Sequence, residues 1–195
     1  VGGVIGTNAT GSHSIRYGMT ADNVAALRCV LADGSQFIAE CDAPNADLHG
    51  AQNTVLGSEI ARIASSARAA IYRDYPKVWR RSSGYNLDFI AEMLAHDPAN
   101  PQAALTPANL HRQGGNLKNH LRQISRFNLA PLIAGSEGTL AVVSEATLDL
   151  VPIPHNTGLV ITSFDSLLDA MRAIPALLSL NPSAIELIGG LFIKL

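Results

Sequence analysis

The sequence predicts an α+β fold in which a mixed or antiparallel sheet is flanked by helices. Three patterns indicate it: a hairpin within residues 24–40, helically spaced apolar residues over 54–75, and an alternating apolar strand over 140–151. Hydrophobic residues make up 47% of the 195 residues and charged residues 15%, a balance that supports a sizeable folded core.

Composition and charge exclude several classes of partner. The formal net charge is −2, and the longest basic tract is Arg80-Arg81, so neither nucleic acid nor an anionic membrane surface is an expected partner. No apolar run reaches the roughly 18–20 residues of a membrane span. Cys29 and Cys41 show no metal-binding spacing, and we expect two reduced, buried thiols, with one disulfide left open.

The first 18 residues contain five glycines and many small hydroxyl side chains. We expect a long loop with a specific backbone shape, whose N–H groups and Thr7, Thr10 and Ser12 hydroxyls could bind anionic oxygens. The pattern is neither a GxGxxG that opens a helix nor a P-loop. Alone it therefore leaves a purely structural turn open.

Local signals predict the next elements in order. Residues 24–31 are expected to form a strand, Asp33-Gly34 a tight turn, and residues 36–40 the return strand. Helices are expected from about residue 54 to Pro76 and over residues 87–94.

Residues 92–127 are polar, with a break at Asp97-Pro98 and Gly114-Gly115 in the middle, and predict a peripheral surface insertion. His111 and His120 match no common zinc spacing, so both are expected to be solvated, and no metal site is predicted.

Order is expected to return at a second glycine turn, residues 135–140, which leads directly into a strand. One face of that strand is expected to carry the apolar residues Leu140, Val142, Ala146, Leu148 and Leu150.

Pro152-Ile153-Pro154 is the candidate domain boundary. Beyond it the pattern predicts a strand at 159–162, a helix and a strand at 184–188. Asp165 or Ser166 is expected to cap the helix, and Pro175 to kink or split it. A unit of this size cannot bury both faces of its sheet alone, so we interpret the chain as a piece of a longer protein.

Four motifs occur in a characteristic order. They are Thr7-Asn8-Ala9-Thr10-Gly11 with Arg16-Tyr17-Gly18-Met19-Thr20, then Val30-Leu31-Ala32-Asp33-Gly34, then Ser82-Ser83-Gly84-Tyr85-Asn86-Leu87, and finally Gly135-Ser136-Glu137-Gly138-Thr139-Leu140 with the strand that follows. The series resembles the FAD-binding domain of the vanillyl-alcohol-oxidase (PCMH-type) flavoproteins, in the branch of D-lactate, glycolate and D-2-hydroxyglutarate dehydrogenases.

This resemblance implies two domains: residues 1–151 as the second subdomain of the PCMH-type FAD-binding domain, and residues 152–195 as the start of a ferredoxin-like substrate (cap) domain. It also implies cofactor contacts, mostly through main-chain groups. The implied FAD-contacting residues are Gly3, Thr7, Asn8, Ala9, Thr10, Gly11, Ser12, Tyr17, Gly18, Gly84, Tyr85, Glu137, Gly138, Thr139, Val142 and Val143. Because one FAD must touch both, loops 7–12 and 135–143 are expected to lie side by side at one edge of the sheet.

The resemblance implies an oxidoreductase that binds FAD non-covalently and oxidises a small D-2-hydroxy acid to a 2-oxo acid. Electrons would pass to an acceptor, with a fused iron–sulfur domain as a candidate, in a cytoplasmic protein for which peripheral membrane attachment is left open. The family's catalytic residues and first phosphate loop are expected outside residues 1–195, so this chain alone should bind FAD weakly or not at all.

Several alternatives remain. The fold could serve as a non-catalytic nucleotide-binding or interaction module, or as a flavoenzyme with different chemistry, such as an ether-lipid synthase. His13 could attach flavin covalently or make a polar contact. Lys77, Arg80 and Arg81 could meet the charge of FAD or of a substrate carboxylate, or form a solvated strand edge with Trp79 beneath.

Overall fold

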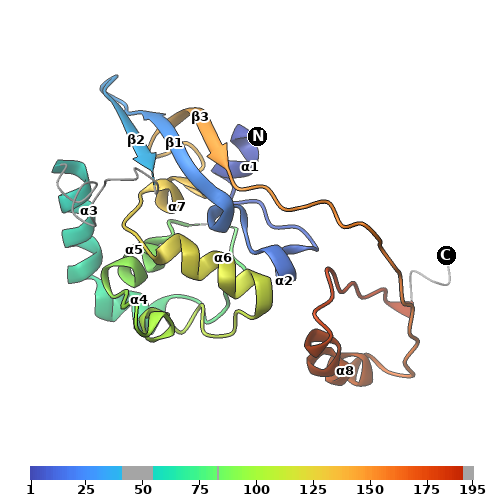
Figure 1. Ribbon diagram of the computed structural model, residues 1–195. Coiled ribbons are helices and arrows are strands. Elements are labelled where there is room, and N and C mark those ends of the chain that lie inside the picture. The colour runs from blue at the N-terminus through green and yellow to red at the C-terminus, as the bar shows by residue number, and fades with distance from the viewer. Residues whose placement is uncertain (41–54, 83, 191–195) are drawn as a thin grey trace.

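A three-stranded antiparallel sheet with helices on one face forms the main body of the chain (Figure 1). The computed structural model describes residues 1–40, 55–82 and 84–190. The strands lie in the order β2 (Gln36–Glu40), β1 (Val24–Val30) and β3 (Val142–Leu148). The α+β class that the sequence predicts is confirmed.

The helices fall into a group under the sheet and one helix apart from it (Figure 1). In chain order the helical segments are α1 (Gly2–Gly6), α2 (Ser14–Tyr17), the 3-10 turn η1 (Thr20–Asn23), α3 (Val55–Ser66), α4 (Arg68–Asp74), α5 (Leu87–Leu94), the 3-10 turn η2 (Pro101–Ala104), α6 (Gly114–Ile124), α7 (Ala130–Ile133) and α8 (Leu167–Ser179).

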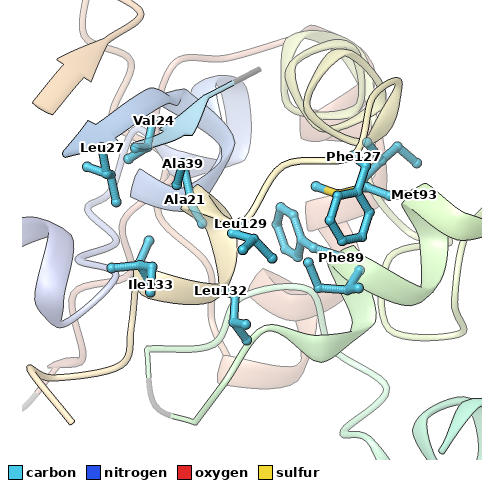
Figure 2. Packing of buried hydrophobic residues seen from close by; sticks show 14 of the residues in the cluster. Ala21, Val24, Leu27, Ala39, Phe89, Met93, Phe127, Leu129, Leu132 and Ile133 are labelled. Atoms are coloured by element: carbon cyan, nitrogen blue, oxygen red, sulfur yellow. The ribbon is translucent and has the colours of Figure 1, made fainter. Parts of the chain in front are cut away.

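The hydrophobic core fills the space between the sheet and helices α5 to α7 (Figure 2). β1 contributes Val24 and Leu27, and α5 contributes Phe89, all fully buried. Ala39 of β2 packs into the same cluster, so both strands of the hairpin bury one face. The core is built mainly from aliphatic side chains, as the low aromatic content requires.

The β1–β2 hairpin forms as predicted. β1 and β2 pair antiparallel, with Leu27 opposite Ala39. In the turn, Gly34 has φ +83°, a left-handed conformation that glycine adopts without strain. The Asp33 carboxylate accepts hydrogen bonds from the amide and the hydroxyl of Ser35, at 2.9 and 2.6 Å. Local turn chemistry therefore determines this element.

The two helices predicted between about residue 54 and Pro76 and over residues 87–94 are confirmed, except that the first of them is divided. The first forms as two helices, α3 and α4, which are separated at Ala67. α5 has the bounds that the sequence predicts.

Residues 1–18 are more ordered than the predicted long loop. Two short helices, α1 and α2, occupy half of the segment. α1 forms because Ile5 is buried in the core and because the carbonyl oxygens of Ile5 and Gly6 accept amides from residues 135 and 137. These tertiary contacts stabilise a helix that a glycine-rich sequence would not form alone.

The prediction of a peripheral insertion at residues 92–127 is wrong. α6 packs against α5 and η1, and Ile124 is completely buried. Leu117, Leu121 and Ile124 recur at helical spacing and bury the apolar face of an otherwise polar helix. His111 is exposed as expected, whereas His120 is fully buried.

β3 forms where predicted, but the predicted core face is only partly right. Leu140 and Leu148 pack against the core, whereas Val142 is 67% exposed and Val143 takes the inward position. The pairing with β1 shifts register between Arg28 and Cys29. Such an irregularity changes which side chains face inward on either side of it.

The described residues after β3 are mostly extended and exposed, apart from α8. Ser166 caps α8 by accepting the Asp169 amide at 3.2 Å, as expected, and Pro175 lies within an undivided helix. The predicted strands at 159–162 and 184–188 do not form. Strands need a hydrogen-bonding partner, and none lies beside these segments among the described residues. No helix among the described residues is long and apolar enough to cross a membrane.

Candidate functional site

The glycine turn at residues 135–138 lies directly against the N-terminal segment. The Gly135 amide donates to the Ile5 carbonyl and the Glu137 amide to the Gly6 carbonyl, each at 2.9 Å. Gly135 has φ +92°, and a Cβ atom there would lie 3.2 Å from Cβ of Asn8. Two segments more than a hundred residues apart are thus side by side next to β3, as the sequence predicts.

The third motif, Gly84-Tyr85, reaches the same place. The hydroxyl groups of Tyr85 and Thr139 lie 2.9 Å apart. A Cβ atom at Gly135 would also lie 3.5 Å from the Gly84 carbonyl oxygen. The Asn86 amide group donates to the carbonyls of Pro131 and Ala134, at 3.0 and 2.9 Å, which fastens this motif to α7. Three of the predicted motifs therefore converge on one surface.

Asn8 holds the loop from inside rather than facing a ligand with its side chain. Its side chain is buried; its Oδ1 accepts the Ala21 amide at 2.9 Å and its Nδ2 donates to the Arg81 carbonyl at 3.2 Å. Its φ of +48° is one that asparagine tolerates better than most residues. Only the main chain of Asn8 is left to contact a cofactor.

The threonine hydroxyls also stabilise the loop. Thr7 donates to the Gly3 carbonyl at 2.9 Å and Thr10 to the Asn8 carbonyl at 3.0 Å. Thr20 donates to the Ala9 carbonyl at 2.7 Å. The hydroxyls of Thr7 and Thr10 thus carry a structural role that the sequence did not indicate.

The main chain of the loops has unused donors. Within the described residues, no acceptor partners the amides of Thr10, Gly11, Ser12 and Gly138. A Cβ atom at Gly11 or Gly138 would meet nothing within 4 Å, so a ligand can approach the backbone closely there. Exposed backbone N–H groups beside open glycines suit an anionic phosphate, so these loops fit the cofactor that the resemblance implies.

The predicted basic patch divides among three roles. Arg80 is exposed, and its Nη2 lies 3.4 and 3.3 Å from the carbonyl oxygens of Thr10 and Gly11, which places a cation at the loop. Lys77 donates to two carbonyls at the end of α4, at 2.6 and 2.8 Å. Arg81 turns inward and pairs with Asp88. The alternative of a strand edge is wrong, because no strand forms here.

The remaining predicted residues lie around the site with different exposure. Gly18 has φ +80° and lies against the Asp22 side chain. The Tyr17 carbonyl accepts from Asn23 at 3.0 Å, so this stretch shapes the base of the loop. Val142 is exposed on the edge strand, whereas Val143 packs into the core. His13 points to the C-terminal region, with its Nδ1 3.1 Å from the Ser183 carbonyl.

Directly behind the loop lies a buried cluster of charged side chains that the sequence analysis missed. The cluster, hereafter the buried ionic cluster, consists of Asp22, Arg81, Asp88, Glu92, Arg112 and His120. Three of them, Glu92, Arg112 and His120, come from residues 92–127, where the polar pattern suggested a surface. The helical spacing of Leu117, Leu121 and Ile124 was the available signal, because it places His120 on the same inward face.

Electrostatics in the buried ionic cluster favour the charged forms of three members. Burial raises the pKa of Asp22, but Arg112 and then His120 outweigh it and lower that pKa to about 2. Burial likewise raises the pKa of Glu92, and His120 brings it below its ordinary value. For His120, burial and Arg112 lower the pKa, whereas Glu92 and Asp22 raise it by more. The net effect is an imidazole that favours its protonated form.

Asp88 differs from the other two carboxyls. Burial raises its pKa above the ordinary value although Arg81 opposes the shift. Its Oδ2 accepts from Asn109 Nδ2 at 3.0 Å and from Arg81. Asp88 and Arg81 therefore join α5 to the segment that carries Arg80 and the Gly84-Tyr85 motif.

Comparisons with known proteins agree with this geometry. Residues 1–40 match the family model described as FAD binding domain. Over 95% of its length the chain is similar to curated proteins named D-2-hydroxyglutarate dehydrogenase. It is 31% identical over 192 residues to that of Pseudomonas putida, 30% over 196 to that of Haemophilus influenzae, and 27% over 190 to that of Escherichia coli. No solved structure matches.

The fold is of the α+β class, and within it residues 1–40 match an FAD-binding domain. The chain is similar to curated proteins of the D-2-hydroxyglutarate dehydrogenase name, which agrees with the branch that the resemblance implies. The chain spans 16% of the length of these curated relatives.

Proposed function

We propose that the surface formed by residues 7–12, 84–85 and 137–139 binds the pyrophosphate-bearing part of FAD. The observation that carries the proposal is the convergence of three motifs, distant in sequence, around unpaired backbone amides. Arg80 adds a positive charge beside the loop, which favours an anionic ligand. The proposed contacts are mainly with main-chain atoms, and Asn8, Gly18 and Val143 contribute by shaping the site.

We further propose that the complete protein oxidises a D-2-hydroxy acid to a 2-oxo acid, and D-2-hydroxyglutarate is the first substrate to test because the relatives are named for it. Bound FAD would supply a hydride acceptor for the substrate α-carbon. Residues of this chain would hold and orient the cofactor, while proton transfer would be the task of groups outside residues 1–195.

The domain boundary, electron acceptor and location belong to the same proposal. A boundary at Pro152 is supported by the continuous exposure of residues 150–169. The length of the relatives beyond the matched region leaves room for an electron-accepting domain, with an iron–sulfur domain as our candidate. The unpaired thiol of Cys29, whose pKa burial raises to about 11, is typical of a protein kept reduced in the cytoplasm. Cys41 lies outside the described residues.

The substitution Gly11→Ala tests the site. A methyl group at Gly11 meets nothing in the fold, but it would stand where the cofactor must approach the backbone. We expect unchanged thermal stability and about tenfold weaker FAD binding, equivalent to roughly 1.4 kcal/mol, measured by titration of flavin fluorescence in the full-length protein. Gly158→Ala is the matched control, because it too meets open space but lies outside the three loops. Equal FAD affinity in both variants would rule out the site.

The reaction is tested separately. Anaerobic addition of D-2-hydroxyglutarate to the full-length, FAD-loaded protein should bleach the oxidised flavin absorbance, and the L-enantiomer should not. Bound flavin that no 2-hydroxy acid reduces would instead support the non-catalytic or the different-chemistry alternative.

A further inference from the structure

The proposed cofactor loop rests on the 3-10 turn η1. The amide of Ala21 and the hydroxyl of Thr20 bind Asn8 and Ala9, at 2.9 and 2.7 Å. η1 in turn is held by Asp22, whose Oδ2 accepts the Met19 amide at 2.8 Å. The shape of the loop therefore depends on where the Asp22 carboxylate is placed.

Asp22 is held from the other side by two residues about a hundred positions away. Arg112 Nη1 lies 2.7 Å from Asp22 Oδ2, and His120 Nδ1 lies 2.9 Å from Asp22 Oδ1. All three side chains are fully buried, so solvent does not screen these contacts. The segment that the sequence assigned to a surface insertion thus reaches the base of the cofactor loop.

The geometry around His120 requires an imidazolium. Its second nitrogen, Nε2, lies 2.6 Å from Glu92 Oε2. A neutral imidazole has one N–H donor, so it could satisfy only one of two ionised carboxylates. Glu92 Oε1 already accepts from the amide and the hydroxyl of Thr106, at 2.7 and 2.6 Å, as expected of an ionised carboxylate.

We propose that Asp22, Arg112 and His120 are positioning residues for the FAD-binding loop, and that protonated His120 keeps this loop in its binding shape. The inference deepens the proposed function and rests on it for the identity of the ligand. The three residues do not touch the cofactor; they act through Met19, Ala21 and Asn8.

The sign of the pH dependence follows from the groups that face His120. Asp22 faces it from η1, Glu92 and Asp88 from α5, and Arg112 from the segment before α6, with the Phe89 ring edge-on at 4.6 Å. The net effect raises the pKa of His120 above 6.5. The stabilisation of the loop by protonated His120 is therefore fully present below pH 6.5. It is lost as the pH rises through the raised pKa of the folded protein. Asp22, with a pKa of about 2, stays ionised throughout that range.

Hydrogen exchange at the Met19 and Ala21 amides provides a readout that needs no cofactor. In the wild-type chain, we expect protection of both amides, corrected for the intrinsic exchange rate, to fall about tenfold as His120 loses its proton, the scale of one hydrogen bond to a charged group. A carbon-detected titration of the His120 ring gives the pH of that step directly. If the protection of these two amides does not fall at the pH where the His120 ring loses its proton, the proposal is overturned.

The variant His120→Gln removes the charge and keeps a polar side chain. It should lower protection at Met19 and Ala21 about tenfold at neutral pH and abolish the step. The control Ile90→Ala opens a cavity elsewhere on α5, where Ile90 is fully buried, and should retain the step while lowering protection across the whole core. Equal losses at all amides in His120→Gln would show a general structural role and contradict positioning. If this variant does not fold, the pH dependence of amide protection in the wild-type chain decides whether His120 positions the loop.

FAD affinity is the second readout. Where the wild-type protein binds FAD, His120→Gln should weaken binding about tenfold, and unchanged affinity despite a loosened loop would overturn positioning. Where the full-length wild-type protein binds no FAD, the proposed function fails, and the exchange data still decide whether the buried ionic cluster orders the loop.

Discussion

Gly18 joins the proposed cofactor loop to η1 in a conformation that few residues tolerate. Its φ is +80°, and an added Cβ atom would lie 2.6 Å from Asp22 Oδ2 and 3.0 Å from Asp22 Cβ. Asp22 cannot move aside without losing Arg112, His120 and the Met19 amide. The backbone at position 18 therefore requires a residue without a Cβ atom. This requirement explains the glycine in the motif better than contact with a ligand does.

We expect Gly18→Ala to destabilise the chain by about 2 kcal/mol or more, since it combines a left-handed alanine with a clash against a buried carboxylate. Gly2→Ala is the control: nothing lies within 4 Å of its added methyl, and alanine in a helix is neutral or stabilising by up to about 1 kcal/mol. Urea unfolding of both variants provides the measurement. Similar stability of the two would contradict the role given to Gly18.

At the scale of single residues, the sequence indicated the positions of the motifs better than the roles of their side chains. Asn8 and Gly84-Tyr85 do lie at one surface, but the Asn8 side chain points inward. His120 was predicted to be solvated, although helical spacing places it on the inward face of α6, because the two carboxylates that pair with it come from other segments. A polar residue alone in a sequence does not show whether tertiary partners will neutralise it.

At the scale of elements, the predictions succeeded where the signals are local. The hairpin and α5 have strong turn and periodicity signals within a few residues. α6 was missed because its polar residues outnumber its apolar ones, although the apolar ones lie on a single face. The strands expected after residue 158 did not form because strand pairing depends on a partner; Leu159, for example, is 86% exposed.

Ile124→Ala tests whether α6 belongs to the core. The side chain is 0% exposed, so truncation should destabilise the chain by about 2–5 kcal/mol. Leu110→Ala removes a similar group from the same segment, where it is 57% exposed, and should change stability by less than about 1 kcal/mol. Thermal or urea unfolding distinguishes them. Equal, small effects would restore the interpretation of a peripheral insertion.

At the scale of the whole molecule, the body and the C-terminal region differ in how they are held. The body combines the sheet, the helices beneath it and the buried ionic cluster, whereas residues 150–169 are exposed throughout (Figure 1). α8 exposes apolar side chains such as Leu168 and Met171. The three motifs of the proposed site all lie on the body.

Chemical-shift mapping can show whether the three distant motifs together form one FAD-binding surface. We expect weak affinity in this chain, so FAD is added to 15N-labelled residues 1–195 up to saturating concentration, with riboflavin, which lacks the pyrophosphate, as the comparison ligand. We expect saturable FAD-dependent shifts at the amides of Gly11, Ser12, Tyr85 and Gly138, with much smaller shifts from riboflavin at Gly11 and Ser12. Saturable FAD shifts that occur only in other parts of the chain would show that the cofactor binds elsewhere and that the three motifs do not form its site.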